Sequence, residues 1–373
     1  MKILIIYPYN PINEEPITGG QLYDHFFISR VITHGRNYTI DFLTDDMLCM
    51  SNKKFFNFAY LHKFSIAKQY DIVLTNSRLY THLILLSLFL KIFSKTKLIS
   101  IHHHFDFLAE INTFKRKIRK FAEIFFLRVS HATIIPNPYI KEIFHQLLPN
   151  RKVIFIESAI KRFSHDISQN KNNNINLLFV GTVEPRKGLS YLVKSLDLLG
   201  KHNILFHCDI VGKIVDEKYF TMLKQEIKKL DLEVSITFRG RVNDDELIEY
   251  YSNATCFVFP SLQEGYGYVI IEAMAFGLPV IAFNNSAMPF TVKNGINGML
   301  AKNKDFEDFE RCIVEIIKNN QLRELLSKGA LETYERSRTF EDIDDNVRLL
   351  CQSDFEILSS SSNNSRKFWK STF

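Results

Sequence analysis

The chain has 373 residues, more than one ordinary hydrophobic core holds, so its length predicts two domains. A hydrophobic content of 46% and a charged content of 24% are typical of a globular protein, and a net charge of +6 is too modest to indicate nucleic-acid binding. The five cysteines are scattered without metal-ligand spacing, which argues against a disulfide framework or zinc site and indicates a reducing compartment. The first apolar run is too short for a signal peptide, so we expect a cytoplasmic protein.

Short apolar runs alternate with helical patterns through the first half of the chain. The runs are residues 3–7, 40–43, 72–74, 98–101 and 132–135. This alternation predicts a parallel sheet with helices on both faces. The apolar run at residues 83–93 is about half the length needed to span a bilayer, and we expect it to be a buried helix.

Two loops of the first half carry candidate ligand-binding residues. Gly19 and Gly20 follow the first strand, and three histidines at residues 102–104 follow the strand at residues 98–101. Ligands of α/β proteins bind at the carboxyl ends of strands, which favours the histidine loop. A flexible turn and structural histidines are the alternatives. Neighbouring residues on a strand point in opposite directions, so adjacent histidines do not predict a metal site.

Residues 114–129 are predicted to form a basic amphipathic helix. Its cations are Lys115, Arg116, Lys117, Arg119 and Lys120, and apolar residues follow them at helical spacing. Such a helix suits an anionic membrane surface, but the pattern also fits an ordinary packed helix with a solvated cationic face. The C-terminal tail, with a Ser/Asn run at residues 359–365 and a basic aromatic end that includes Trp369, could add to membrane binding.

The alternation restarts after a polar stretch at residues 164–174, whose composition suits a linker. The strands expected in the second half are residues 175–180, 205–211, 235–239, 256–260 and 279–283. Asp244 and Asp245 fall at an expected helix start rather than in a metal-binding pattern. The sequence therefore predicts a second α/β domain.

The loop at residues 181–188 (GTVEPRKG) follows an apolar strand and opens an amphipathic helix. Its glycines, including Gly181, allow close backbone approach, and a helix N-terminus offers free N–H groups. Arg186 and Lys187 add two cations, so the loop suits a pyrophosphate. A plain strand-to-helix turn with a solvated basic pair is the alternative.

The segment at residues 260–274 (PSLQEGYGYVIIEAM) combines two carboxylates with a glycine-containing turn. Glu264 lies in the loop and Glu272 within the following helix. A carboxylate accepts two hydroxyl hydrogen bonds, which suits vicinal diols, and the N–H groups near Gly267 and Tyr268 could bind a phosphate between them. A nucleotide sugar has these groups; an ordinary helix N-terminus with favourable acids is the alternative.

Residues 176–300 resemble the donor domain of retaining GT-B glycosyltransferases, specifically glycosyltransferase family 4. Glu264 and Glu272 match that family's pair of glutamates, and residues 179–189 resemble its phosphate loop. Further segments resemble other family landmarks in the same order: residues 209–212, 238–240, 258–261 and 272–281. The resemblance implies an α/β fold of the GT-B type, with two Rossmann-like domains facing across a cleft.

The same resemblance implies residue roles. Lys187 would contact the donor diphosphate, Glu264 the hydroxyls of the transferred sugar, and Glu272 the ribose. The other donor-binding residues implied are Gly19, Gly20, Gly181, Arg186, Gly265, Tyr266, Gly267 and Tyr268. A family histidine at the end of a first-domain strand faces the transferred sugar; His102 is our first choice for it and His103 the second.

We therefore expect an acceptor-binding domain at residues 1–165, a linker at 166–175 and a donor-binding domain at 176–338. The C-terminal helix and tail at residues 339–373 are expected to pack back on the first domain. Two positions depart from the family: Thr182 stands where an Arg is frequent, and Phe290 stands where a Glu is frequent.

The sequence hypothesis is a glycosyltransferase that moves a sugar from a UDP- or GDP-sugar to a carbohydrate or lipid-linked acceptor, with retention and without a metal or cofactor. It would serve cell-surface polysaccharide or glycolipid synthesis and bind no nucleic acid. Contact with the inner face of the membrane is expected through residues 115–120 and the tail. A GT-B-like scaffold without activity and a sugar-nucleotide 2-epimerase remain as alternatives.

Overall fold

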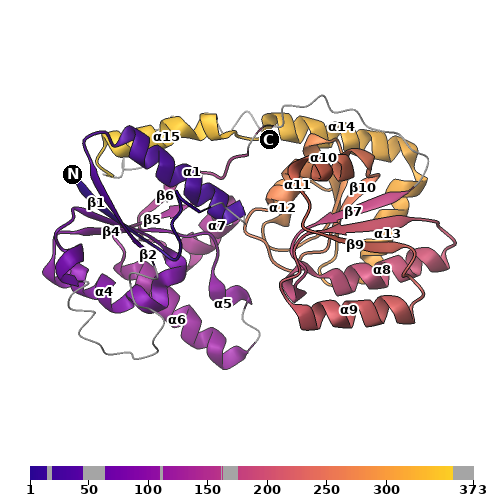
Figure 1. The fold of residues 1–373 in the computed structure, drawn as a ribbon, viewed down its shortest axis with the longest axis horizontal. Helices are drawn as coiled ribbons and strands as arrows, with labels where there is room; N and C mark the ends of the chain where they lie inside the picture. Colours follow the sequence, from indigo (N-terminus) through magenta and orange to yellow (C-terminus); the bar gives the residue numbers. More distant parts are fainter. Residues whose placement is uncertain (15–18, 45–63, 110–111, 161, 163–174, 356–373) are drawn as a thin grey trace. The chain divides into compact units, whose positions relative to one another are not determined.

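The computed structural model describes residues 1–14, 19–44, 64–109, 112–160, 162 and 175–355. The chain forms two compact units: Met1–Ala159 together with Phe340–Phe373, and Ile160–Thr339. Each contains a six-stranded parallel sheet with helices on both faces, which confirms the predicted α/β class (Figure 1). Most of the expected linker and the tail beyond residue 355 lie outside the described residues.

The sheet of the first unit has the strand order β2-β1-β3-β4-β5-β6. Its strands are β1 (Lys2–Tyr7), β2 (Thr39–Thr44), β3 (Ile72–Asn76), β4 (Lys97–Ile101), β5 (Ala132–Ile135) and β6 (Val153–Phe155). The first five match the predicted runs, and β6 was not predicted. The strand order reverses direction between β1 and β3, and the carboxyl ends of strands at such a point are where α/β folds bind ligands.

Both faces of this sheet are buried, as the apolar runs indicate. Along β1, Ile3 and Ile5 pack on one face while Leu4 and Ile6 pack on the other. The first face is covered by α1 (Gly19–His34) and α15 (Phe340–Gln352). The second face is covered by α4 (Tyr80–Phe93), α6 (Thr113–Val129) and α7 (Pro138–Leu147), with the short α5 (Asp106–Ala109) against α6.

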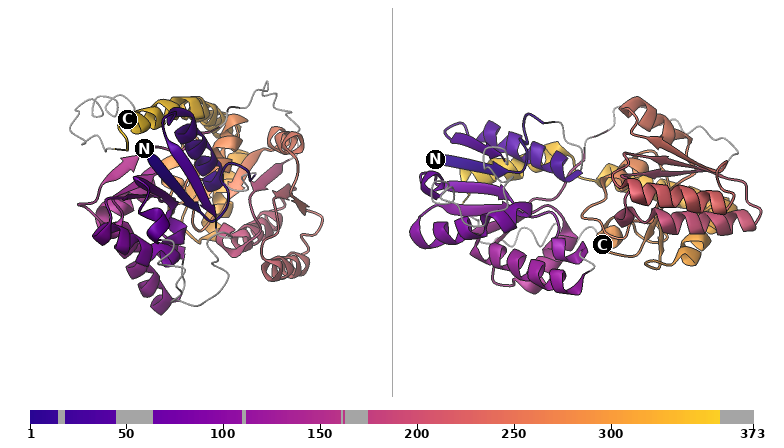
Figure 2. Two further views of the ribbon diagram at one scale, coloured as in Figure 1. Left: turned by 60° about the vertical axis from the view of Figure 1, so that its left-hand side comes forward. Right: turned by 60° about the horizontal axis from the view of Figure 1, so that its bottom comes forward.

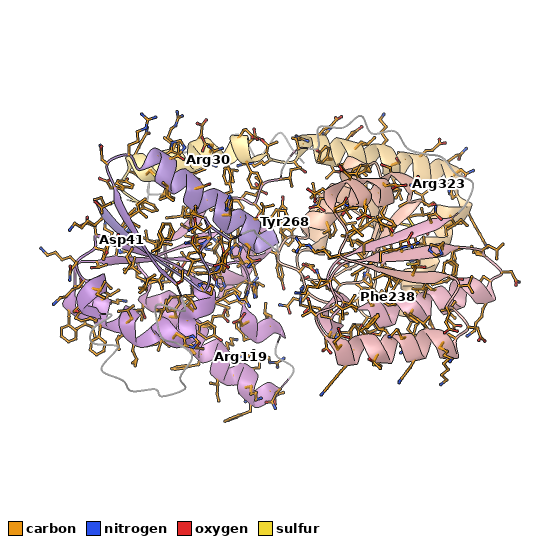
Figure 3. The ribbon with its side chains drawn as sticks, in the orientation of Figure 1. Arg30, Asp41, Arg119, Phe238, Tyr268 and Arg323 are labelled. Carbon is orange, nitrogen blue, oxygen red and sulfur yellow. The ribbon has the colours of Figure 1, made fainter. Side chains whose placement is uncertain are left out.

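Helix α15 belongs to the first unit, although the whole second unit separates it from β6 in the sequence. It lies along α1 in the views of Figures 1 and 2. The Phe340 ring stacks on Phe26 at 4.4 Å between centroids, and Ile343 is fully buried. Asp344 forms an ion pair with Arg30, labelled in Figure 3, at 3.2 Å and a hydrogen bond with His34 at 2.9 Å.

The sheet of the second unit has the strand order β12-β11-β10-β7-β8-β9. Its strands are β7 (Asn176–Val180), β8 (His207–Val211), β9 (Ile236–Gly240), β10 (Cys256–Phe259), β11 (Val280–Phe283) and β12 (Gly298–Ala301). Only β12 was not predicted. The order reverses between β7 and β10, so the loops after these two strands are adjacent at a topological switch point.

The helices of the second unit lie on both faces of its sheet. They are α8 (Leu189–Lys201), α9 (Glu217–Lys229), α10 (Asp244–Asn253), α11 (Tyr268–Ala275), α12 (Met288–Thr291), α13 (Phe306–Lys318) and α14 (Asn320–Arg336). Helix α8 contacts α9 and α13, while α11 packs against α14. Asn243 caps α10 in a capping box, with Asp244 and Asp245 in its first turn.

Three further observations bear on the sequence expectations. Within the described ranges, no helix combines the length and apolarity needed to cross a bilayer. Helix α4, expected to be buried, buries Leu83, Leu86 and Leu90 but leaves Ile92 and Phe93 exposed by 59% and 65%. The four cysteines within the described part of the chain are buried free thiols.

Candidate active site

Two loops of the second unit meet at its topological switch point. The first follows β7 and contains a short 3-10 helix (Pro185–Lys187), and the second follows β10. Gly188 has a φ of 69°, and a Cβ there would lie 2.0 Å from the carbonyl oxygen of Pro260. The Leu262 N–H donates to the Arg186 carbonyl at 2.9 Å. Glycine is therefore required at position 188 for the loops to pack this closely.

The carboxylate of Glu264 joins these two loops. Its Oε1 accepts from Lys187 Nζ at 2.5 Å, from Ser261 Oγ at 2.8 Å and from an Arg186 Nη1 group at 3.1 Å. Its backbone N–H donates to Ser286 Oγ at 3.0 Å. Within the described residues, Oε2 makes no hydrogen bond, so one carboxylate oxygen is free to accept from a ligand.

The cations keep Glu264 ionised. Burial by itself would raise the pKa of Glu264, but the charges of Lys187 and Arg186, with hydrogen bonds from Lys187 and Ser261, hold it below its usual range. The Lys187 ammonium also lies 5.0 Å from the centre of the Phe259 ring. The site therefore holds a fixed anion and a buried cation in direct contact.

Thr182 and Arg186 are joined through a second glutamate. Glu184 Oε1 accepts from Thr182 Oγ1 at 2.7 Å and from Arg186 Nη2 at 2.8 Å. Arg186 also donates to the Gln263 carbonyl at 2.8 Å, so its guanidinium points toward the second loop. The two cations and two carboxylates of this group cancel in formal charge.

The N-terminus of α11 lies four positions after Glu264. Gly267 precedes the helix with a φ of 82°, and Tyr268, labelled in Figure 3, is its first residue. The rings of Tyr266 and Tyr268 contact each other at 4.8 Å between centroids. The first N–H groups of a helix and the positive end of its dipole favour an anion, as the sequence predicts for Gly265 to Tyr268.

Glu272 lies in a different environment from Glu264. It sits on α11, and its Oε2 accepts from Tyr251 Oη at 3.0 Å. Burial raises the pKa of Glu272, an effect that the Tyr251 hydrogen bond reduces and the charge of Asp244 increases. The structure places Phe290 on α12, half-buried.

A second group of polar residues lies at the carboxyl ends of strands in the first unit, around the buried carboxylate of Asp24. Asp24 Oδ2 accepts from Tyr9 Oη at 2.8 Å and from Asn76 Nδ2 at 3.0 Å. Its Oδ1 bonds His103 Nε2 at 2.8 Å. Gly20 lies one turn before Asp24 on α1, and a Cβ there would be 3.8 Å from the His103 ring. The structure thus brings Gly20 and His103 together.

The two candidate histidines differ in their exposure. His102 has no exposed surface; its Nδ1 bonds Ser77 Oγ at 2.8 Å, and burial with the nearby charges of His104 and His103 lowers its pKa to about 3. His103 keeps 15% of its side chain exposed. The first choice made from the sequence, His102, has its side chain in the core, and the second choice, His103, is the one that is partly exposed.

The sequence did not single out Asp24, Tyr9 or Asn76. The available signal was the spacing of Gly20 and Asp24, four positions apart on a predicted helix and hence on one face. The pairing of Asp24 with residues after β1 and β3 is set by the strand order, which sequence spacing does not reveal. Among the described residues, no cluster of His, Cys, Asp and Glu has a metal-binding arrangement.

Comparisons with known proteins agree with this architecture. Residues 160–333 match the family described as Glycosyl transferases group 1. An uncharacterized glycosyltransferase of Methanocaldococcus jannaschii is 30% identical over 54% of this chain and 54% of its own length. The O-antigen chain mannosyltransferase B of Escherichia coli is 30% identical over 41% of this chain and 40% of its own. The chain spans about half the length of the curated relatives it matches.

Solved structures share the fold over nearly the whole chain. The sucrose-phosphate synthase of Thermosynechococcus elongatus matches with a TM-score of 0.75 and 18% identity, covering 95% of this chain and 99% of its own. An Anabaena protein in complex with UDP and glucose matches with a TM-score of 0.70 and 17% identity, covering 95% of this chain and 100% of its own. At this identity the likeness establishes the fold alone.

Proposed function

We propose that this chain, whose residues 160–333 match the glycosyl transferases group 1 family, transfers a sugar from a nucleoside diphosphate sugar to an acceptor hydroxyl with retention of configuration. The observation that carries the proposal is the Glu264 carboxylate, held by Lys187, Arg186 and Ser261 with one oxygen free. It lies in the loop after β10, at the switch point of a parallel sheet, immediately before a helix N-terminus.

The donor's diphosphate is proposed to bind the cations and amides of this site. The leaving diphosphate gains negative charge as the glycosidic bond to it breaks. Lys187, Arg186 and the N–H groups at Gly267 and Tyr268 are donors that could stabilise that charge without a metal ion. Gly181 lies close to the Lys187 side chain, since a Cβ at Gly181 would be 3.6 Å from Lys187 Cε.

The two glutamates are proposed to bind the two sugars of the donor. Glu264 Oε2 would accept from hydroxyls of the transferred sugar, because an ionised carboxylate accepts only. Glu272 would bind the ribose; its contact with Tyr251 would orient it. The contacts described for this site do not distinguish a uracil from a guanine base. UDP- and GDP-sugars are therefore both proposed as donors and both tested. His103 is proposed to contact the transferred sugar, with Asp24 fixing its ring.

The relatives suggest the biological setting. Proteins similar to this chain include a Staphylococcus aureus glycosyltransferase of capsular polysaccharide biosynthesis and the E. coli O-antigen mannosyltransferase. A polysaccharide or glycolipid acceptor is therefore proposed for this chain also, with the reaction in the cytoplasm at the membrane surface.

Helix α6 carries the proposed membrane contact. Phe114, Ile118 and Phe121 are exposed by 71%, 53% and 74%, although the helix buries Phe126 and Leu127 further along. They lie at positions i, i+4 and i+7, on one face of the helix. Cations occupy the positions between them. Exposed large apolar groups among cations are the features by which a helix binds an anionic bilayer.

The donor-site proposal is tested by a screen of UDP- and GDP-sugars that measures nucleotide release and sugar transfer. Glu264→Gln should lower transfer by about 100-fold or more, the order expected for a lost transition-state contact. Its affinity for free UDP or GDP should be equal or higher, because Lys187 and Arg186 lose a competing anion. Glu249→Gln, an exposed change on α10, is the matched control.

The outcomes separate the alternatives. Near-wild-type transfer by Glu264→Gln would contradict the proposed site. Calorimetry that finds no binding of either nucleotide to the wild-type chain would favour the scaffold alternative. Conversion of a donor in the absence of any acceptor would indicate the epimerase.

The membrane contact is tested by flotation with phosphatidylglycerol-containing vesicles. Binding should decrease with salt, because surface charges are screened beyond about 10 Å at 0.1 M ionic strength. Phe121→Ser should weaken it. Leu325→Ser, which removes an apolar side chain that is 58% exposed on α14, should leave it unchanged. Failure of the wild-type chain to float with anionic vesicles would remove this part of the proposal.

A further inference from the structure

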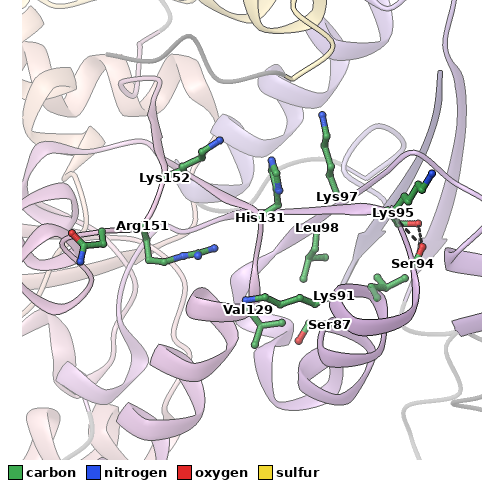
Figure 4. A pocket seen from close by; sticks show the side chains of 13 residues that line it. Ser87, Lys91, Ser94, Lys95, Lys97, Leu98, Val129, His131, Arg151 and Lys152 are labelled. Carbon is green, nitrogen blue, oxygen red and sulfur yellow. Dashed lines mark hydrogen bonds between the residues drawn. The ribbon is translucent and has the colours of Figure 1, made fainter. Parts of the chain in front are cut away.

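The first unit contains a cationic pocket at the amino ends of its strands, whereas Asp24 and His103 lie at the carboxyl ends. Three consecutive helix-to-strand connections line it: the end of α4 with the start of β4, the end of α6 with the start of β5, and the residues before β6. Its volume is about 450 Å³. Its cationic lining is Lys91, Lys95, Lys97, His131, Arg151 and Lys152, shown in Figure 4.

The lining has one sign of charge. Five permanent cations and one histidine surround the pocket, and none of its lining residues is acidic. Like charges gathered in one hollow repel one another and attract anions. Ser87, Ser94 and Thr96 add hydroxyl groups, and Asn150 adds an amide. Cations beside hydroxyl and amide donors are the chemistry that binds phosphate groups.

Part of this charge has a local structural explanation. The ends of helices α4 and α6 open toward the pocket, and cations are favourable at helix C-termini. Lys91 Nζ donates to the Arg128 carbonyl at 3.4 Å, and Arg151 donates to the Ser130 carbonyl. These contacts do not account for Lys95 and Lys152, which are exposed at the pocket and form no ion pair within the described residues.

The pKa of His131 is sensitive to the positive charges that line the pocket. It is half-buried between β4 and the segment before β6. Burial lowers the pKa of His131, and the charges of Lys152, Lys97 and Arg151 lower it further. An anion in the pocket would oppose that field, so the pKa of His131 should rise when one binds.

We propose that this pocket binds a phosphorylated ligand through its cluster of cations, of which Lys95 and Lys152 form no ion pair within the described residues. The pocket lies at the amino ends of β4, β5 and β6, away from the strand ends that carry Asn76 and His103. Its role is therefore anchoring or regulation rather than group transfer. The phosphate could belong to a soluble compound or to a lipid headgroup; the exposed Ile92 and Phe93 follow Lys91 directly.

The first arm of the experiment uses inorganic pyrophosphate and the full chain. Since Lys187 and Arg186 could also bind a diphosphate, the signal must come from the pocket itself. We therefore follow the imidazole resonances of His131 by NMR, assigned with His131→Gln. Pyrophosphate should raise the pKa of His131. The affinity should fall about tenfold or more in Lys95→Gln/Lys152→Gln, as expected for lost charge-assisted contacts, and stay unchanged in Arg36→Gln, an exposed cation outside the pocket.

The second arm uses vesicles of phosphatidic acid in phosphatidylcholine, with Phe121→Ser in every variant to weaken the α6 contribution. Loss of flotation in Lys95→Gln/Lys152→Gln, but not in Arg36→Gln, identifies a lipid headgroup as the ligand. If the His131 signal does not respond to about 10 mM pyrophosphate and flotation does not depend on the two lysines, the proposal is overturned. A His131 response that persists in the double variant also overturns it.

Discussion

Two glutamates eight positions apart differ in the sign of their pKa shifts. Lys187 and Arg186 outweigh burial at Glu264 and lower its pKa, whereas burial dominates at Glu272 and raises its pKa. The difference comes from the partners, since Glu272 has a tyrosine hydroxyl where Glu264 has two cations. An ionised carboxylate accepts hydrogen bonds only, so the proposed sugar contact of Glu264 persists to lower pH than an isolated glutamate would allow.

Asp24 is predicted to act on the reaction by positioning His103. The carboxylate bonds Nε2 of the ring, and Tyr9 and Asn76 hold the carboxylate. Asp24→Asn and His103→Gln should each lower transfer, and the double variant should be no worse than His103→Gln alone. Such non-additivity is expected of residues that act as one unit. The measurement is a double-mutant cycle on kcat/KM.

The control for this cycle is Asp41→Asn, which removes an exposed carboxylate on β2 that accepts from Tyr70. It should leave transfer unchanged and combine additively with His103→Gln. Additive losses for Asp24 and His103 would show that they act independently.

Glu123 is predicted to make stability depend on pH. It is buried on α6, where desolvation and the charge of Asp106 raise its pKa to about 8. In the unfolded chain it titrates near pH 4.3, so between that pH and about 8 folding takes up a proton. Stability should therefore fall as pH rises through this window. Glu123→Gln keeps the acceptor for the Asp106 N–H and should reduce the fall.

Denaturant unfolding at several pH values measures this effect. Glu142→Gln, an exposed change on α7, should retain the wild-type pH dependence. An unchanged slope in Glu123→Gln would mean that Glu123 is ionised in the folded state.

At the scale of residues, the sequence named candidate residues of the second unit but not their contacts. Lys187 and Glu264 were named from two separate loops, but their direct ion pair arises because β7 and β10 are neighbours in the sheet. His102 was chosen before His103 in the sequence analysis. Three consecutive histidines do not reveal which ring enters the core. Asp24 was missed because its partners come from β1, β3 and the loop after β4.

At the scale of elements, ten of the twelve strands that the structure describes were predicted, and two strands at sheet edges were missed. The two missed strands, β6 and β12, have three and four residues and lie at sheet edges. Edge strands pair on one side only, so a weak apolar run is enough to form them. Gly298 in β12 also weakens the pattern; a Cβ there would lie 2.2 Å from the Val280 carbonyl oxygen, so close strand packing requires it.

The packing of α15 on α1 leads to a stability prediction. Ile343 is fully buried in the core cluster that contains α1 and β1. Ile343→Ala should lower the free energy of unfolding of the first unit by about 2–5 kcal/mol, the range for a buried Ile or Leu truncated to Ala. Leu349→Ala, on the same helix but 48% exposed, should have a much smaller effect. Chemical denaturation of both variants makes the comparison, and equal losses would contradict the observed packing.

At the scale of the whole molecule, the first unit is discontinuous in sequence and the second is continuous. The chain enters and leaves the second unit at one place, where the Ile160 N–H donates to the Arg338 carbonyl at 2.9 Å. Arg162 donates to the carbonyls of Tyr334 and Glu335, each at 2.7 Å. The sequence placed a linker before residue 176, but it contained no signal that residues 160 and 339 would pair as a bridge.

This arrangement predicts that the second unit folds alone and that the first does not fold without α15. A fragment of residues 160–339 keeps both glutamates, Lys187 and the contacts that close its ends. It should unfold cooperatively and bind UDP or GDP within a few-fold of the affinity of the full chain, since each tenfold loss requires about 1.4 kcal/mol of missing contacts. Lys187→Met in the fragment should abolish most of that binding.

A fragment of residues 1–159 lacks Ile343, Val347 and Leu350, so the apolar side chains of α1 that they cover become exposed. Exposed apolar surface of this kind leads to aggregation or loss of structure. Circular dichroism should show a weaker, less cooperative transition than in the full chain. The 160–339 fragment could instead fold but bind neither nucleotide, while the full chain binds one. Residues of the first unit would then be needed for donor binding, and Gly20 and His103 would be the first to mutate.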